Sequence, residues 1–350
     1  MKTVMITEPG SISVENTSER YTECGENEAL LRVRYCGICG ADVASYTGNQ
    51  PFTTYPRIPG HEFSAEIVSL PSGYNGDLRV GEKVTANPYF NCGKCYSCRR
   101  GHVNCCHDNQ TMGVQRDGSF REYIKMPVSR IYSGKGLDLK TLALIEPFSI
   151  GWHAVSSIDF SKFGKSGVKP KILVTGAGPI GLFALISAKL KGKEYGASVY
   201  SADLLDGRLA KAKYFGADGT VNTSTADIKE YTDSVTGGDG FDVCIEACGA
   251  PETFMMAIDS CTFAGDVVLI GNGKRPTTFV HSVILKKELT IHGSRNSLPE
   301  DFTGLIDYVA RGETDISSMI SGGYSVDDCK KAFDALVTND GSLCKLLIEL

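Results

Sequence analysis

Five of the thirteen cysteines in this 350-residue chain fall within one stretch of fifteen residues, CGKCYSCRRGHVNCC. Gaps of two, two and seven residues separate Cys92, Cys95, Cys98 and Cys106. Zinc takes four thiolates at tetrahedral angles about 2.3 Å away, and two-residue gaps let a tight turn direct neighbouring sulfurs inward. We therefore predict a closed, structural zinc site, with Cys105 left over. An iron–sulfur site or a set of reduced surface thiols is the alternative.

A second set of possible metal ligands comes earlier in the chain. Cys39 lies in CGICGAD, and His61 and Glu62 lie in PGHEF. Soft and hard donors together are typical of a zinc ion with one exchangeable position. Taken singly, Cys39 is typical of a small buried apolar residue, and the His–Glu pair is typical of a surface pair or of a pair in the core.

Glu146 ends an apolar run in LALIEPFSIGWHA. A carboxylate there is costly unless it is paired or bound to a metal. We expect Glu146 either to bind the second metal directly or to act through one of its ligands. The alternative is a residue at a helix start, stabilised by the helix dipole.

A glycine-rich turn follows the apolar segment KILVTG and precedes a helical pattern. In it, Gly176 permits the tight turn, Gly178 lets the backbone approach a pyrophosphate, and Gly181 permits close helix–strand packing. The next strand, SVYSAD, ends in Asp203, which suits the ribose hydroxyls of NAD and repels the 2′-phosphate of NADP. Arg208 is a complication, because a guanidinium there can instead hold that phosphate.

Two kinds of element must position these residues. Up to about residue 148, short β-branched runs at residues 29–35, 64–70 and 83–86 alternate with turn residues and predict an irregular β domain. From Pro170 on, strands alternate with amphipathic helices, which predicts a parallel, doubly wound α/β sheet. Helical patterns at 281–287, 299–311 and 325–337 and a last strand near 345–348 follow.

Composition limits the class of protein. The chain has 36 basic and 41 acidic residues, a net charge of −5, and no long basic run, so we expect neither a nucleic acid nor a membrane partner. The N-terminal MKTVMITEPG lacks the apolar core of a signal peptide, and no apolar stretch approaches the roughly 18 residues of a membrane helix. With an odd number of cysteines, these features predict a cytoplasmic protein with a small-molecule partner.

These motifs together resemble the zinc-dependent medium-chain dehydrogenases, in particular the polyol (sorbitol-type), threonine and sugar-acid dehydrogenases. The resemblance covers essentially the whole chain and rests on GICGAD, PGHE, the four-cysteine lobe, VGEKV, DGSFREY, ALIEPFSIGWHA, VTGAGPIG, Asp203 with Arg208, and GSRNS. It implies a GroES-like catalytic domain at residues 1–150 and 294–350, a Rossmann NAD-binding domain at 151–293, and an active site in the cleft between them. Relatives are commonly dimers or tetramers, so we expect a homo-oligomer.

The resemblance also implies roles for single residues. Cys39, His61 and Glu62 match the catalytic zinc ligands, Glu146 matches a further acidic position, and Asp42 matches a carboxylate that orients a ligand. The coenzyme contacts would be Gly176, Gly178, Pro179, Ile180, Gly181, Asp203, Arg208, Gly271, Asn272, Gly273 and Arg295. The four clustered cysteines match the structural zinc ligands, which makes two zinc ions per subunit.

Two departures from the family pattern affect proton transfer. Many relatives carry Ser or Thr where this chain has Ala41, and His where it has Ala44, and those groups pass the substrate proton to solvent. We therefore expect Glu146 or Glu62 to act as the general base. Ala65, where glycine is common, has no evident chemical meaning.

We thus expect oxidation of a secondary hydroxyl, with zinc polarising the oxygen and hydride passing to NAD. Neighbouring polar groups favour a polyol or a sugar acid: Ser45, Tyr46, Arg116, Glu146 and Arg295. Arg116 also reads as an ordinary solvent-facing arginine. The alternatives are a threonine-type amino-alcohol dehydrogenase and a zinc- or nucleotide-binding sensor without turnover.

Overall fold

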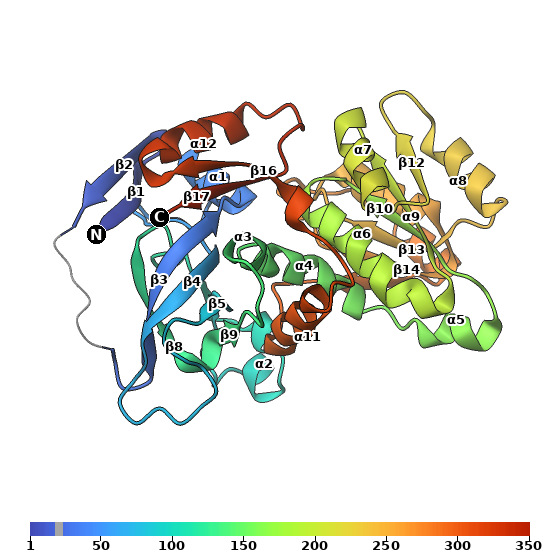
Figure 1. Ribbon diagram of the computed structural model, residues 1–350. Helices are drawn as coiled ribbons and strands as arrows, with labels where there is room; N and C mark the ends of the chain where they lie inside the picture. Colours follow the sequence, from blue (N-terminus) through green and yellow to red (C-terminus); the bar gives the residue numbers. More distant parts are fainter. Residues whose placement is uncertain (18–23) are drawn as a thin grey trace. The chain divides into compact units, whose positions relative to one another are not determined.

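The computed structural model describes residues 1–17 and 24–350 (Figure 1). The chain divides into two compact units, and the division falls inside helix α4 (Ile145–Ser156). Unit 1 comprises Met1–Glu146 and Ser297–Leu350, and unit 2 comprises Pro147–Asn296. The resemblance placed the same boundaries at residues 150/151 and 293/294.

Unit 1 is built on a mixed sheet in which strand β3 (Glu28–Gly37) is central. Along the main path the strand order among the described residues is β16 (Ile320–Ser325), β17 (Lys345–Glu349), β3, β4 (Glu62–Ser69), β5 (Lys83–Ala86) and β9 (Ile131–Ser133). Strand β8 (Tyr123–Pro127) also pairs with β3. The three predicted β segments thus correspond to β3, β4 and β5.

Smaller elements surround this sheet. Paired strands are β1 (Lys2–Glu8) with β2 (Ser11–Asn16), and β6 (Tyr89–Phe90) with β7 (Gln110–Thr111). The α-helices of unit 1, besides the start of α4, are α1 (Gly40–Tyr46), α2 (Tyr96–Arg99), α3 (Leu139–Leu142), α11 (Pro299–Ala310) and α12 (Cys329–Val337). The 3-10 turns are η1 (Val103–Cys105), η2 (Val128–Arg130), η4 (Ser317–Met319) and η5 (Val326–Asp328).

Unit 2 contains a six-stranded sheet in which every described pairing is parallel. Its order is β12 (Gly219–Asn222), β11 (Ser198–Asp203), β10 (Lys171–Thr175), β13 (Phe241–Glu246), β14 (Cys261–Leu269) and β15 (Thr290–Gly293). The strand order therefore reverses between β10 and β13. In such sheets, ligands bind at the carboxyl ends of the strands at this switch point. The predicted doubly wound sheet is confirmed.

Helices connect the strands of unit 2. They are α5 (Ser161–Ser166), α6 (Pro179–Gly192), α7 (Asp206–Tyr214), α8 (Ile228–Thr236), α9 (Pro251–Ser260) and α10 (Ser282–Lys287), with the 3-10 turn η3 (Lys193–Tyr195). Helix α6 packs against β10 and β11, and α9 packs against β13, β10 and β14. The sequence analysis did not single out β12 or α8, because both are short and polar.

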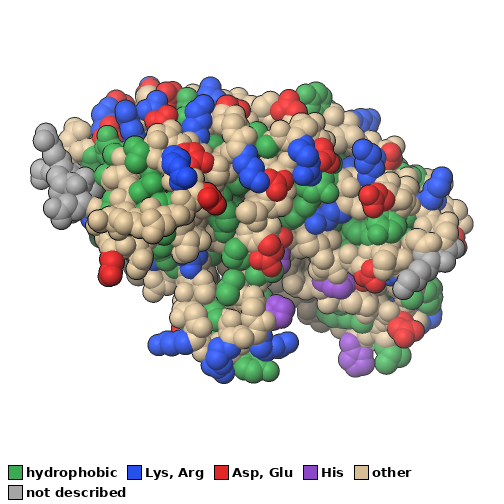
Figure 2. Space-filling view, turned by 60° about the horizontal axis from the view of Figure 1, so that its bottom comes forward, with side chains coloured by type: hydrophobic (Ala, Val, Ile, Leu, Met, Phe, Trp, Pro, Cys, Tyr) green, Lys and Arg blue, Asp and Glu red, His purple; other side chains and the backbone are tan. Residues whose placement is uncertain are grey.

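Three further properties bear on the expected class. All thirteen cysteines are free of disulfide bonds. Among the described residues, no helix has the length and apolar character needed to cross a membrane. On the face seen in Figure 2, acidic and basic side chains are interspersed over most of the surface, and several Lys and Arg side chains gather on the lobe at the bottom of the view.

The C-terminal segment completes the core of unit 1. Phe333 on α12 is fully buried, and its ring packs edge-on against Tyr46 and lies 6.0 Å, centroid to centroid, from Phe120. These aromatic contacts join residues near both ends of the chain, which explains why the last fifty residues fold with the first domain.

We predict that Phe333→Ala lowers the free energy of unfolding of unit 1 by about 3–5 kcal/mol, because it leaves a cavity among Tyr46 and Phe120. Val337→Ala on the same helix is the control: Val337 is 47% exposed, and the expected change is within about 0.5 kcal/mol. Denaturant unfolding followed by tyrosine fluorescence measures both. Equal effects of the two substitutions would contradict the packing role of Phe333.

Candidate metal centres and coenzyme site

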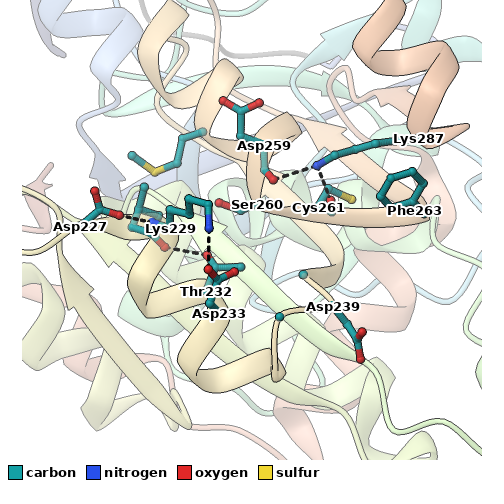
Figure 3. A pocket seen from close by; sticks show the side chains of 14 residues that line it. Asp227, Lys229, Thr232, Asp233, Asp239, Asp259, Ser260, Cys261, Phe263 and Lys287 are labelled. Atoms are coloured by element: carbon teal, nitrogen blue, oxygen red, sulfur yellow. Dashed lines mark hydrogen bonds and ion pairs between the residues drawn. The ribbon is translucent and has the colours of Figure 1, made fainter.

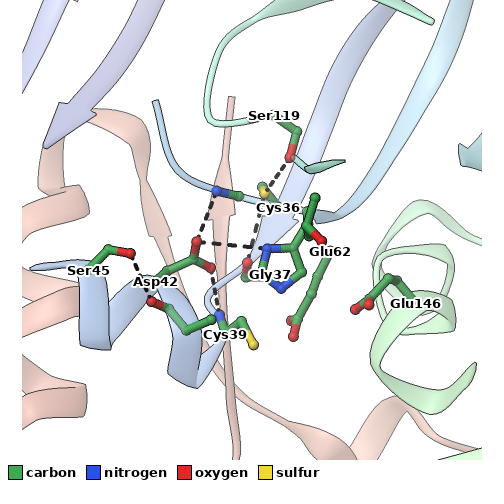
Figure 4. Close-up of polar contacts among 12 residues, drawn as sticks. Cys36, Gly37, Cys39, Asp42, Ser45, Glu62, Ser119 and Glu146 are labelled. Atoms are coloured by element: carbon green, nitrogen blue, oxygen red, sulfur yellow. Dashed lines mark hydrogen bonds and ion pairs between the residues drawn. The ribbon is translucent and has the colours of Figure 1, made fainter. Parts of the chain in front are cut away.

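The structure brings Cys39, His61 and Glu62 together. One ligand atom from each lies within 4.8 Å of the others. Cys39 is the residue before α1, and His61 and Glu62 lie where the chain enters β4 (Figure 4). His61 and Glu62 are buried, while Cys39 is partly accessible. The group therefore has the composition and accessibility of an open metal site.

Asp42 joins the two segments that carry these ligands. Its Oδ2 accepts a hydrogen bond from the Cys39 backbone N–H at 2.9 Å, and its Oδ1 accepts one from the Gly60 N–H at 3.0 Å. The Nδ1 atom of His61 lies 3.9 Å from the same Oδ1. One fully buried carboxylate thus fixes the start of α1 against the turn that presents His61 (Figure 4).

The turn before His61 depends on Gly60. Its φ is +99°, and a Cβ atom there would collide with the ring of the buried Phe120. A side chain at this position would strain the backbone and displace the core. The glycine of the PGHE motif is therefore required by the close approach of the chain to Phe120.

Lys345 on β17 forms an ion pair with Glu62, and the sequence analysis missed it. The ammonium group contacts Glu62 Oε1, and the two side chains are 3% and 1% exposed. Nearly every other residue of β17 is buried and apolar, as the segment KLLIE shows. A lysine inside such a strand was the available signal, since buried lysines almost always have a charged partner.

Glu146 lies in the first turn of α4 and is held by Tyr89. The buried Tyr89 hydroxyl donates a hydrogen bond to Glu146 Oε1. Glu146 is not part of the group whose ligand atoms lie within 4.8 Å of one another. Figure 4 nevertheless shows its carboxylate pointing from α4 toward Glu62. Sequence reasoning did not find Tyr89, because nothing near it in the sequence distinguishes it from a core aromatic residue.

The electrostatics of this group show a surplus of negative charge. Burial and the Glu62 carboxylate raise the pKa of Glu146 to about 7. Burial alone would lower the pKa of His61 and of Lys345, but nearby Cys39 and acidic groups raise both above their ordinary values. The pKa values of Glu146, His61 and Lys345 are thus all raised. Each raised pKa favours the protonated form, which removes negative charge or adds positive charge.

The residues present fit a divalent cation. Glu62 Oε2 is buried and has no hydrogen-bond partner among the described residues. Buried polar atoms without partners are costly, and a cation bound among a thiolate, an imidazole and a carboxylate would also offset the surplus charge. A soft and hard donor set of this kind suits zinc.

The second cysteine group is also assembled. The sulfur atoms of Cys92, Cys95, Cys98 and Cys106 lie within 4.8 Å of one another, and the Cys95 sulfur is 3.4 Å from that of Cys98 and 4.0 Å from that of Cys106. Four ligands at 2.3 Å from a tetrahedral zinc are about 3.8 Å apart, which matches these separations. Cys105 is exposed and lies outside the group.

The glycine turn of unit 2 has the geometry of a dinucleotide loop. Gly176 follows β10 with φ +93°, and α6 begins at Pro179, directly after Gly178. A Cβ atom on Gly181 would overlap the carbonyl oxygen of Gly176, whereas one on Gly178 would meet no atom within 4 Å. Gly181 is therefore required for packing, and Gly178 leaves open space at the helix N-terminus.

Asp203, at the carboxyl end of β11, is tied to this turn. Its Oδ2 accepts a hydrogen bond from the Ala177 N–H at 2.7 Å, and its Oδ1 accepts one from the Leu205 N–H at 3.0 Å. Arg208 Nη1 lies 3.7 Å from Asp203 Oδ2. Asp203 and Arg208 thus lie together beside the glycine turn.

Glu246, at the carboxyl end of β13, is a further residue that the sequence analysis missed. Its buried Oε1 accepts hydrogen bonds at 2.8 Å from the N–H groups of Cys248 and Gly249, and at 2.7 Å from the Thr253 hydroxyl. A Cβ on Gly271 would collide with the Gly249 backbone nitrogen, so the predicted 271–273 contact segment packs directly on this loop. Arg295 is exposed beyond β15.

The polar residues predicted to contact substrate have other partners here. The buried Ser45 hydroxyl is 2.7 Å from the Thr53 hydroxyl, and the Tyr46 hydroxyl donates to Asp334 on α12 at 2.8 Å. The Arg116 guanidinium stacks 3.6 Å from the Phe90 ring centroid.

A cavity of about 500 Å³ lies in unit 2 (Figure 3). It is lined by residues of α8 and α9 and by Cys261, the first residue of β14, and so lies at the amino end of the sheet. Its lysines are engaged: Lys229 pairs with Asp233 at 2.6 Å, and Lys287 donates to three backbone carbonyls. Ligands of such sheets bind at the opposite end.

Two protein-family models match the chain. The alcohol dehydrogenase GroES-like domain matches residues 25–135, and the zinc-binding dehydrogenase model matches residues 179–311. The first match lies within unit 1, and most of the second lies within unit 2. The fold and the two family matches therefore define a zinc-type medium-chain dehydrogenase.

Individual relatives support the same family assignment. L-galactonate-5-dehydrogenase of Escherichia coli K12 is 35% identical over 93% of this chain and 92% of the relative. Sorbitol dehydrogenase of Halalkalibacterium halodurans is 32% identical over 93% of this chain and 92% of the relative. A crystal structure of the alcohol dehydrogenase RspB from Escherichia coli CFT073, complexed with NADH, matches with a TM-score of 0.89 and 29% identity over 100% of this chain and 99% of that one.

This chain belongs to the zinc-type alcohol dehydrogenase family, and it is an oxidoreductase that acts on CH–OH groups. The predicted family, the GroES-like and Rossmann folds, and the predicted enzyme class are confirmed.

We predict that Gly181→Ala destabilises unit 2 by about 1–3 kcal/mol, because the added methyl group overlaps the Gly176 carbonyl. Gly178→Ala is the matched control: it should leave thermal stability within about 0.5 kcal/mol of wild type yet weaken coenzyme binding at least about tenfold, since backbone must approach the pyrophosphate there. Thermal unfolding and NADH titration by fluorescence measure the two effects. Unchanged NADH affinity in Gly178→Ala would rule out this turn as the pyrophosphate site.

Proposed function

We propose that this protein oxidises a secondary hydroxyl of a polyol or sugar acid by hydride transfer to NAD, with a catalytic zinc ion held by Cys39, His61 and Glu62. The observation that carries the proposal is the composition of this buried group. It offers three mixed donors and surplus negative charge, and it leaves a coordination position for a substrate oxygen. A closed structural site would use all four positions.

Four residues of unit 1 have named roles in this proposal. Cys39, His61 and Glu62 bind the metal, and Asp42 orients Cys39 and His61 through its contacts with both segments. When bound, zinc supplies Lewis-acid polarisation of the substrate hydroxyl. Burial of the group excludes bulk water and so strengthens every charge interaction within it.

Glu146 is the proposed proton acceptor. Ala41 and Ala44 replace the hydroxyl and imidazole groups through which relatives pass the proton, so a carboxylate must take that role. Glu146 points into the group, and its pKa of about 7 suits proton uptake near neutral pH. Glu62 is the less suitable base, because its Oε1 already contacts the Lys345 ammonium.

In unit 2, the glycine turn and the N-terminus of α6 bind the pyrophosphate in this proposal. Asp203 favours NAD, since its carboxylate accepts hydrogen bonds from ribose hydroxyls and repels a 2′-phosphate. The ion-pair distance between Arg208 and Asp203 supports this preference, because the carboxylate already offsets the guanidinium charge that NADP would need.

The substrate class follows from the relatives. The similar proteins include an L-galactonate dehydrogenase and a sorbitol dehydrogenase, which supports a polyhydroxylated substrate. We further propose that the four-cysteine lobe binds a structural zinc ion, supported by the match of its sulfur separations to tetrahedral coordination.

We predict NADH formation, followed by absorbance, when the zinc-loaded protein is given NAD and a panel of five- and six-carbon polyols and aldonates. We expect kcat/KM to be at least about tenfold higher with NAD than with NADP, because of Asp203. Activity with L-threonine alone would instead identify an amino-alcohol dehydrogenase. No turnover with any alcohol, despite bound zinc and NAD, would favour a non-catalytic sensor.

We also predict that Glu146→Gln lowers kcat at least about tenfold, equivalent to about 1.4 kcal/mol, because an amide cannot accept the proton. Steady-state kinetics on the best panel substrate measure this. Glu349→Gln, at an exposed position of β17, is the control and should leave kcat unchanged. If Glu146→Gln does not lower kcat tenfold, the proposed proton route is wrong.

A further inference from the structure

Lys345 places a buried positive charge beside the candidate catalytic metal site, and no step of the proposed reaction uses it. Both side chains of the Lys345–Glu62 pair are at least 97% buried. Sheet register holds the pair in place: Leu347 of β17 pairs with Gly37 of β3, and Gly37 in turn pairs with Glu62 of β4. Three adjacent strands therefore carry the ammonium group to the carboxylate.

The contact is made by one oxygen of Glu62. Oε1 contacts the Lys345 ammonium, while Oε2 is buried with no hydrogen-bond partner among the described residues. A carboxylate can bind a metal through one oxygen or through both. With Oε1 engaged by a cation, single-oxygen binding is favoured, and the charge of Lys345 also weakens the attraction between Glu62 and a second cation.

We propose that Lys345 is a positioning residue that restricts Glu62 to weak, single-oxygen contact with the catalytic metal and so keeps one coordination position open for the substrate hydroxyl. This inference rests on the proposed function, because it requires a metal at Cys39, His61 and Glu62. Removing the ammonium frees both oxygens and removes a nearby positive charge. Both changes strengthen metal binding and fill the open position.

A purely structural ion pair makes the opposite prediction. If Lys345 only held β17 and β4 together, its removal would loosen the site, and the metal would leave faster. Losing one partner of a buried pair is destabilising in either case, so stability alone does not discriminate. The direction of the change in metal retention discriminates between the two roles.

The test compares the zinc-loaded wild-type protein with Lys345→Met and Lys345→Arg. Zinc content is measured first, and zinc transfer to a chromogenic chelator at pH 8 is then followed over time. The phase that disappears in Cys39→Ser is assigned to the catalytic site. Cobalt-substituted proteins add a second readout, because the d–d absorption bands of Co²⁺ depend on how many ligands surround the ion.

We expect Lys345→Met to lose the catalytic metal at least about tenfold more slowly than wild type, within the range of effects seen for residues that hold metal ligands. Its cobalt bands should shift toward higher coordination. Lys345→Arg, which keeps the charge, should stay within about twofold of wild type. Combined with Glu62→Gln, Lys345→Met should change the rate less than about twofold, because the carboxylate it acts through is gone.

Loss of the metal at the wild-type rate or faster in Lys345→Met would overturn the inference. If that variant does not fold, Lys345→Gln, which keeps a hydrogen-bond donor without the charge, must show the slower loss, and faster loss there would overturn the inference equally. Absence of zinc from the wild-type group would instead refute the proposed function. Zinc present but insensitive to Lys345 refutes only the positioning role.

Discussion

A surplus of buried negative charge is the constraint around which unit 1 is organised. Asp42, Glu62 and Glu146 lie together in a region with little exposure to water, and the pKa values of Asp42, His61, Glu146 and Lys345 shift in the directions that such a surplus requires. Lys345 offsets one charge, and a divalent cation would offset more. Strand β3 is central because it lies between β4 and β17, which carry Glu62 and its counter-ion.

The two glutamates beside the metal ligands differ in what holds them. Glu62 is paired with the ammonium group of Lys345. Glu146 accepts a hydrogen bond from the Tyr89 hydroxyl, whose pKa is raised well above its ordinary value by burial and by Glu146, so Tyr89 stays neutral. A neutral partner leaves Glu146 free to exchange a proton. Two carboxylates in similar surroundings can thereby divide metal binding and proton transfer between them.

Unit 2 meets a different constraint, which is close approach of backbone to backbone. Gly181 lies against the Gly176 carbonyl, and Gly271 lies against Gly249. Two buried carboxylates satisfy the backbone N–H groups left free by these turns: Asp203 accepts from Ala177, and Glu246 accepts from Cys248 and Gly249. The carboxyl end of the sheet is therefore shaped before any coenzyme binds, which limits the ordering cost of binding.

The sequence by itself determined the features whose residues lie near one another along the chain. The cysteine spacing and the glycine turn after KILVTG are local, so their geometry follows from a few consecutive residues, and the alternation of strands and helices predicted the parallel sheet. Only the tertiary structure decided the partners that act across the chain. Tyr89 meets Glu146 over 57 residues, and Lys345 meets Glu62 over 283. Sequence spacing carries no information about such contacts, because strand pairing and core packing alone bring the two side chains together and remove them from water.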